Sequence, residues 1–232
     1  EKYSLKEMLQ FLRYKPIWAA FAATLIVGTG SSIAGGAGAY FYTYVLGDMK
    51  LMSGVSVIGL IASLVGIVMG PYLANRFGKK KVYLTAVIIS TALNLLRLLD
   101  VTSMILIYIS ALIGGVAGGW MVPVNTSIQA DNTTYVQYKT GKRAEAAIAS
   151  LTSFVSKVAQ GLGGAIPGYV IAAYGFVTGA SVQPESINTG IILCALILPL
   201  IFGILGLLIF GTQYTLDQKA VIEMDAKINR NN

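Results

Sequence analysis

Residues Ala144 to Tyr174 read AEAAIASLTSFVSKVAQGLGGAIPGYVIAAY and are mostly apolar. This stretch is long enough to cross a bilayer, which takes about 20 apolar residues in an α-helix. Lys157 is the only acid or base between Glu145 and Glu185. A charge at the bilayer centre costs about 2.5 to 3.5 kcal/mol on insertion scales, so it survives where it faces a partner or a water-filled path. The stretch predicts a membrane helix with a functional site at Lys157.

The rest of the chain has the same apolar character. Of its 232 residues, 55% are hydrophobic and only 12% are charged, which is typical of polytopic membrane proteins. We predict an all-α membrane protein with six transmembrane helices. The six stretches of sufficient length are Ile17–Leu46, Ser53–Asn75, Val82–Leu99, Met104–Ile128, Ala144–Tyr174 and Asn188–Phe210.

The net charge of +7 is distributed in a way that predicts topology. Basic residues are concentrated in alternate gaps between the apolar stretches: Lys2–Lys15, Arg76–Lys81, Lys139–Arg143 and Lys219–Arg230. By the positive-inside rule, both termini are cytoplasmic and the protein is a multi-pass protein of the cell (inner) membrane. The basic runs lack interleaved aromatic residues and would lie at a phospholipid surface, so we expect no nucleic-acid partner.

Three segments follow from this topology. Residues 1–15 are expected to form a cytoplasmic linker with an amphipathic helix, because Leu5, Met8 and Leu12 recur at helical spacing. Residues 16–212 form the six-helix bundle, and 213–232 form a cytoplasmic tail. Because the chain begins at Glu1 without an initiator methionine, we expect a fragment of a longer transporter.

The composition leaves little chemistry for catalysis. Cys194 is the single cysteine and the chain has no histidine, which excludes a disulfide framework and a Cys/His metal site. The carboxylates are scattered over loops and helix ends without an inward-facing pair. We therefore expect no enzyme, no catalytic residue and no metal site.

Two of the predicted helices carry polar side chains on one face. In the fifth, polar or small residues recur at spacings of three and four, which places them on one arc: Ser150, Ser153, Lys157, Gln160 and Gly164. The alternative is a lysine that is neutral, or is paired with a carbonyl for packing alone. In the fourth, Asn125 and Gln129 share a face, which either lines a cavity or packs against neighbouring helices.

Other features favour structural roles. Ala62, Gly66 and Gly70 repeat every four residues and predict a close helix crossing. Arg97 follows Asn94 by one turn, and we expect it to extend outward to the interface or to pair with Asp100. The alternative is a direct contact between Arg97 and a ligand.

Three motifs carry a family resemblance: YFYTYVLGD at 40–48, GPYLANRFGKK at 70–80 and, most specifically, YVQYKTGKRAE at 135–145. With them the chain resembles the glycoside-pentoside-hexuronide:cation symporters, the melibiose-carrier-like family of the major facilitator superfamily. It matches the C-terminal six of that family's twelve helices. The resemblance implies the C-terminal bundle of a secondary transporter that moves a sugar or glycoside with a cation by alternating access.

The resemblance also implies site residues and partners. Lys157 matches the lysine of the family's eleventh helix, which lines the sugar cavity, and Thr152, Ser153 and Ser156 stand at neighbouring cavity positions. Asp131 and Arg143 match an acid and a base that, in the family, pair between the two halves and close the cytoplasmic end of the cavity. The N-terminal six-helix half would be the partner across the cavity. It would supply most of the ligands of the coupling cation, Na⁺ or H⁺, so no cofactor is expected here. The alternatives are a non-transporting membrane scaffold or regulatory half-protein, and a facilitator with a non-sugar substrate.

Overall fold

The computed structural model describes residue 8 and the ranges 10–180 and 182–230, and all regular structure in these ranges is helical. The elements are a short turn η1 (Phe11–Arg13), α2 (Lys15–Tyr40), η2 (Phe41–Val45), α3 (Lys50–Phe77), α4 (Lys79–Arg97), α5 (Met104–Thr140), α6 (Glu145–Ala173), α7 (Ser186–Ile192), η3 (Leu193–Ile197), α8 (Leu198–Gln213) and α9 (Gln218–Arg230). The predicted all-α fold is confirmed. The amphipathic helix expected before Tyr14 falls largely outside the described residues.

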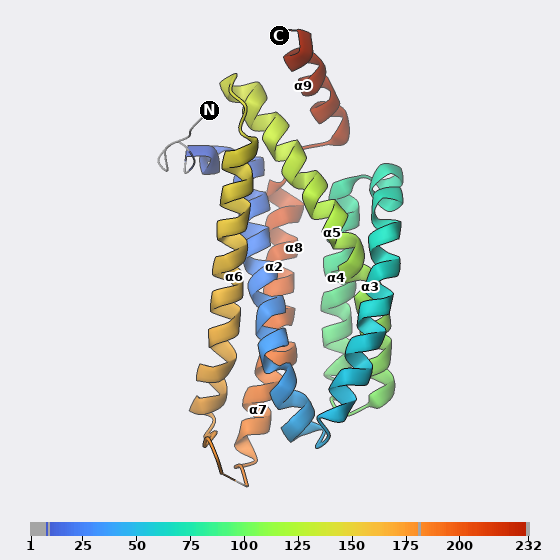
Figure 1. Ribbon diagram of the computed structural model, residues 1–232, viewed down its shortest axis with the longest axis vertical. Coiled ribbons are helices and arrows are strands. Elements are labelled where there is room, and N and C mark those ends of the chain that lie inside the picture. The colour runs from blue at the N-terminus through green and yellow to red at the C-terminus, as the bar shows by residue number, and fades with distance from the viewer. Residues whose placement is uncertain (1–7, 9, 181, 231–232) are drawn as a thin grey trace.

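Six long helical segments stand side by side, because η2 continues α2 and η3 joins α7 to α8 (Figure 1). Each contains most of one predicted stretch, but α5 runs 12 residues past the predicted end of the fourth stretch at Ile128. Four are long and apolar enough to span a membrane: Lys15–Val45, Lys50–Phe77, Met104–Thr140 and Ser186–Gln213. The other two, α4 and α6, are less apolar because α4 begins with three lysines and α6 carries Lys157 and Gln160. Their crossing of the membrane stays a prediction.

Glycines allow the sharp reversals between helices. Gly78, with a φ of +87°, is the single residue between α3 and α4, and Gly141, with a φ of +72°, ends α5 in the left-handed conformation. A glycine accepts a positive φ without the steric cost of a Cβ. The second span can therefore return directly as the third, which brings the lysines after Gly78 to one end of the bundle.

The bundle consists of two groups of three helices. Helices α2, α6 and α8 pack together, α3, α4 and α5 pack together, and α4 against α8 joins the groups (Figure 1). The connection is built from aromatic rings, because Phe210 of α8 lies 4.1 Å from the ring of Tyr83 on α4 and 4.4 Å from that of Tyr214. By contrast, α2 and α5 hardly touch each other. A seam thus runs between the two groups.

Each group contains one crossing in which glycine meets backbone. A Cβ on Gly66 of α3 would collide with the Val116 carbonyl of α5, and a Cβ on Gly119 with the Ser63 carbonyl. The predicted stripe of Ala62, Gly66 and Gly70 is buried in this crossing, which confirms its packing role. In the other group Gly163 of α6 meets the backbone of α2 at Thr29 and Ile33 in the same way. Small residues let membrane helices approach this closely.

Candidate functional site

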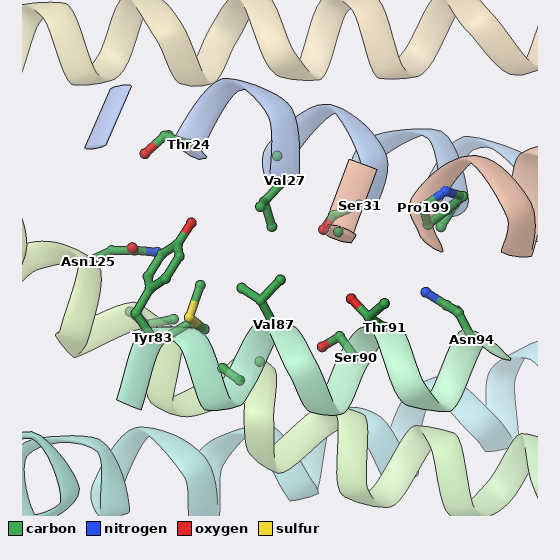
Figure 2. A pocket seen from close by; sticks show the side chains of 17 residues that line it. Thr24, Val27, Ser31, Tyr83, Val87, Ser90, Thr91, Asn94, Asn125 and Pro199 are labelled. Carbon is green, nitrogen blue, oxygen red and sulfur yellow. The ribbon is translucent and has the colours of Figure 1, made fainter. Parts of the chain in front are cut away.

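A cavity of about 550 Å³ lies in the seam between the two helix groups. Its walls come from α2, α4, α5 and α8, and Figure 2 shows side chains from these helices facing one another across it. The polar side chains on its walls belong to Thr24, Ser31, Tyr83, Ser90, Thr91, Asn94 and Asn125. None of the lining residues carries a charge. The cavity therefore offers neutral hydrogen-bonding groups.

These groups are gathered at two ends of the cavity. Thr24, Tyr83 and Asn125 lie toward one end, and Val27 faces Val87 across the middle (Figure 2). At the other end, four polar side chains lie close to one another: Ser31, Ser90, Thr91 and Asn94. Polar ends around an apolar middle suit a ligand that has both hydroxyl groups and an apolar face, since ligand pockets combine mostly apolar walls with a few convergent polar groups.

The amides and hydroxyls of this cavity are available to a ligand. Within the described part of the chain, the structure gives Ser90, Asn94 and Asn125 no side-chain hydrogen bond to protein. Thr24 differs because its hydroxyl donates to the carbonyl of Ala20 at 2.8 Å. An amide has two donors and an acceptor, so the two asparagines alone can bind several hydroxyl groups.

Of the sequence-predicted site residues, Asn125 is the one that lines this cavity. Ser153, Lys157 and Gln160 lie together on the exposed face of α6, and they confirm the shared face that their spacing predicts. That face is opposite Ala159 and Gly163, which are buried. The structure thus places the lysine and the central cavity in two separate regions of the chain.

The two remaining α6 candidates, Thr152 and Ser156, are half-buried. The Thr152 hydroxyl donates to the carbonyl of Ile148 at 2.8 Å, one helical turn back. Such a bond satisfies the hydroxyl within its own helix. Of these two residues, Ser156 therefore has the freer hydroxyl.

In the C-terminal part of α5, the predicted gate acid Asp131 is buried and paired. Its Oδ1 lies 2.6 Å from Nζ of Lys79, at the start of α4. The neighbouring Lys80 donates to the carbonyl of Tyr214 at 2.6 Å. Burial raises the pKa of the Tyr214 phenol, and the charge of Asp131 raises it further, so the phenol stays protonated. Two lysines of one turn therefore connect α4 to the ends of α5 and α8.

Arg143, the predicted basic partner in the gate, does not meet Asp131. Its side chain is exposed, and the structure gives it no ion pair within the residues described. Sequence reasoning missed Lys79 because it is 52 residues from Asp131, and the pair forms only once α4 and α5 pack. A cluster of lysines after a glycine between two helices indicates that one of them can pair with an acid of a neighbouring helix. The sequence does not show which lysine does so.

The expectation for Arg97 is wrong. Its guanidinium lies over the ring of Phe41, 5.0 Å from the centroid, and turns inward instead of extending to the interface. It does not pair with Asp100, because the Asp100 carboxylate accepts bonds from the backbone N–H and the hydroxyl of Thr102 at 3.1 and 3.0 Å. The Asp100 carboxylate is thus hydrogen-bonded within its own turn, and the guanidinium makes a cation–π contact with the Phe41 ring of η2.

Comparison with known proteins gives this architecture a family. The family model for MFS/sugar transport proteins matches residues 2–218. The chain is 30% identical to the uncharacterized symporter YjmB of Bacillus subtilis (strain 168), over 97% of this chain and 50% of the symporter. It is 29% identical to a glucuronide carrier protein homolog of Escherichia coli (strain K12), over 96% of the chain and 50% of the homolog. The isoprimeverose transporter of Lactiplantibacillus pentosus is 28% identical over 64% of the chain and 31% of its own length.

The chain spans about half the length of the curated relatives it matches. The match to the family covers nearly the whole chain, and the relatives are symporters, carriers and transporters. This confirms the resemblance that the three sequence motifs carry. The chain belongs to the MFS/sugar transport protein family and is a multi-pass membrane protein of that family's helical fold.

Proposed function

We propose that this chain is the C-terminal six-helix half of a secondary transporter that moves a sugar or glycoside together with Na⁺ or H⁺ by alternating access. The observation that carries the proposal is the neutral cavity of about 550 Å³ in the seam between the two helix groups. Its volume lies within the roughly 300 to 1,000 Å³ of small-molecule sites. Hydroxyl and amide side chains match the chemistry of a sugar, which has many hydroxyl groups and no charge.

The arrangement of helices supports the same proposal. Each six-helix half of a major facilitator contains two inverted three-helix repeats, and substrate binds near the midplane where repeats meet. In chain order the two repeats would be α2, α3 and α4, followed by α5, α6 and α8. The first helix of each repeat packs against the last two helices of the other: α2 against α6 and α8, and α5 against α3 and α4. The cavity borders both first helices, α2 and α5. We therefore place the N-terminal half against this seam.

Lys157 is proposed to donate a charged hydrogen bond to the substrate from α6, with Ser153 and Gln160 beside it. The support is their exposure on one face of a membrane helix, where a lysine needs water, a ligand or a partner. Ser156 and Thr152 would border this face, and Asn125 would contact the substrate from the cavity. The coupling cation would be held mainly by the N-terminal half.

Asp131 and Arg143 are proposed to help close the cytoplasmic end. In this half Lys79 holds the Asp131 carboxylate, so the acid is positioned before any contact across the seam forms. Arg143 is exposed and free to reach an acid of the other half. Both termini would then be cytoplasmic, in the cell membrane.

The test is uptake into proteoliposomes. We define the assembled carrier as this chain joined to the six-span segment that we expect to be encoded upstream of Glu1. It is expected to take up a labelled neutral glycoside in a saturable manner when a Na⁺ or H⁺ gradient is imposed. The chain alone is expected to give none, since it supplies one side of the site. Saturable uptake by the chain alone, or no upstream six-span segment, would refute the proposal.

A further inference from the structure

A second cavity, of about 240 Å³, lies beside the central one, between η2, α3, α4 and α5. The two share Ser90 and Asn94 of α4 as lining residues. The second differs in character because Arg97 lies on its wall, whereas no acid does. Tyr42 and Ser110 add two hydroxyl groups. Cationic and hydrogen-bonding groups thus converge on a small space.

Two of these groups are buried without a partner. In the described part of the chain, neither Nε of Arg97 nor Oγ of Ser110 has a hydrogen-bond partner. Buried polar atoms are nearly always hydrogen-bonded, and an orphaned charge-bearing donor is the costlier kind. Nothing nearby in sequence relieves it, because Asp100 bonds to Thr102 instead.

The surroundings hold the guanidinium in place without neutralising it. The guanidinium carbon lies 5.0 Å from the centroid of the Phe41 ring, a cation–π contact that uses none of the N–H donors. Guanidinium edges match a carboxylate, which can accept two parallel N–H bonds. Asn94 and Ser110 can donate further bonds to the same oxygens.

We propose that this cavity is a binding site for a small carboxylate of acetate size, held by Arg97, Ser110 and Asn94. Its volume is below that of drug-sized sites and is sufficient for such an ion. The bound carboxylate neutralises the only charge on the cavity wall. Since Asn94 also lines the central cavity, occupancy at Arg97 orients an amide that faces the proposed sugar site. The site itself does not depend on the proposed transport function.

The experiment uses the whole 232-residue chain in nanodiscs, with thermal unfolding followed by the fluorescence of Trp18 and Trp120. Sodium acetate is titrated against sodium chloride at constant ionic strength and pH in a buffer without oxyanions. Acetate is expected to raise the unfolding midpoint in a saturable manner, and chloride is not. Arg97→Gln is expected to weaken the apparent Kd for acetate at least tenfold. The control Arg76→Gln, in an exposed arginine at the end of α3, leaves the Kd unchanged.

Ser110→Ala removes one donor with little disturbance, and a threefold or larger loss of acetate affinity is expected. This variant decides the question if Arg97→Gln does not fold. The proposal is overturned if acetate and chloride act alike on the parent chain, or if acetate binds the Arg97→Gln or Ser110→Ala variants as tightly as the parent. A further alternative is that an acidic side chain of the N-terminal half fills the site in the assembled carrier. In that case acetate would bind to this chain alone but not to the assembled carrier, and the proposal would be overturned.

Discussion

The crossing of α3 with α5 and the crossing of α2 with α6 are built alike but have different outer faces. In the first, Gly66 and Gly119 meet backbone and Gly70 meets the ring of Pro123; in the second, Gly163 meets backbone and Gly36 meets the ring of Pro167. Helices α3 and α6 flank the bundle at opposite edges (Figure 1).

Their outer faces are made for different surroundings. Along the middle of α3, from Val57 to Met69, the exposed side chains are apolar, among them Leu60, Leu64 and Val68, the last 79% exposed. On α6 the corresponding exposed face carries Ser153, Lys157 and Gln160. Because lipid penalises charge, the same crossing can present one helix to lipid and the other to a polar path. On α6, the buried face packs against α2, and the opposite face carries the side chains that we propose to contact the substrate.

The largest expected effect comes from filling the crossings. Gly119→Ala and Gly163→Ala each place a Cβ against backbone, which cannot move cheaply, and we expect losses of about 3 kcal/mol or more in unfolding free energy. Gly118→Ala and Gly164→Ala are matched controls, because nothing lies within 4 Å of either Cβ. Unfolding in mixed micelles measures the difference. Equal stability within each pair would show that the crossings are not close.

The second-largest effect is expected when a charge is added to the apolar outer face of α3 or removed from the polar outer face of α6. Val68→Lys puts a charge on the α3 face, and it is expected to cost about 2.5 to 3.5 kcal/mol of insertion free energy. Lys157→Met should insert at least as well as the parent chain. A translocon insertion assay of each helix measures both. If Val68→Lys inserts as well as Val68, the α3 face does not meet lipid.

For substrate, Lys157→Met is expected to weaken glycoside binding to the assembled carrier by about 1.5 to 3 kcal/mol, or roughly ten- to over a hundredfold. The loss is that of one charged hydrogen bond. Lys142→Met, in the exposed turn before α6, is the control and should bind normally. Equilibrium binding of labelled glycoside gives the answer, and parental affinity in Lys157→Met removes the lysine from the site.

A smaller effect is expected in the central cavity. Asn125→Leu removes a neutral hydrogen-bonding group from its wall, which typically contributes about 0.5 to 1.5 kcal/mol, so affinity should fall up to about tenfold. Gln129→Leu, one turn along α5 and outside the cavity wall, should leave affinity unchanged. The reverse order of the two would place the substrate contact one turn further along α5, outside the central cavity.

The sequence predicts features that depend on length and period. The six helices follow from the thickness of a bilayer, and the α6 face follows from the spacing of Ser153, Lys157 and Gln160. Helix ends are less predictable. The fourth stretch was expected to end at Ile128, yet α5 continues to Thr140, because polar residues outside lipid can extend a helix.

What the sequence does not predict depends on which helices pack together. The central cavity needs residues from four helices, and the Lys79–Asp131 pair needs α4 beside α5. Arg97 shows how a local rule fails. Asp100 is three residues away, but the acid is used in its own turn, and Phe41, distant in sequence, receives the cation.

Thiol labelling can show whether α6 borders an aqueous substrate path while α3 faces lipid. In the assembled carrier with Cys194 replaced by alanine, Ser153→Cys and Val68→Cys are treated with a charged, membrane-impermeant reagent. We predict that the cysteine at 153 is modified, that saturating glycoside slows its modification, and that the cysteine at 68 stays unmodified. Modification of position 68 as fast as position 153, or a position 153 that only an apolar reagent reaches, would contradict the account.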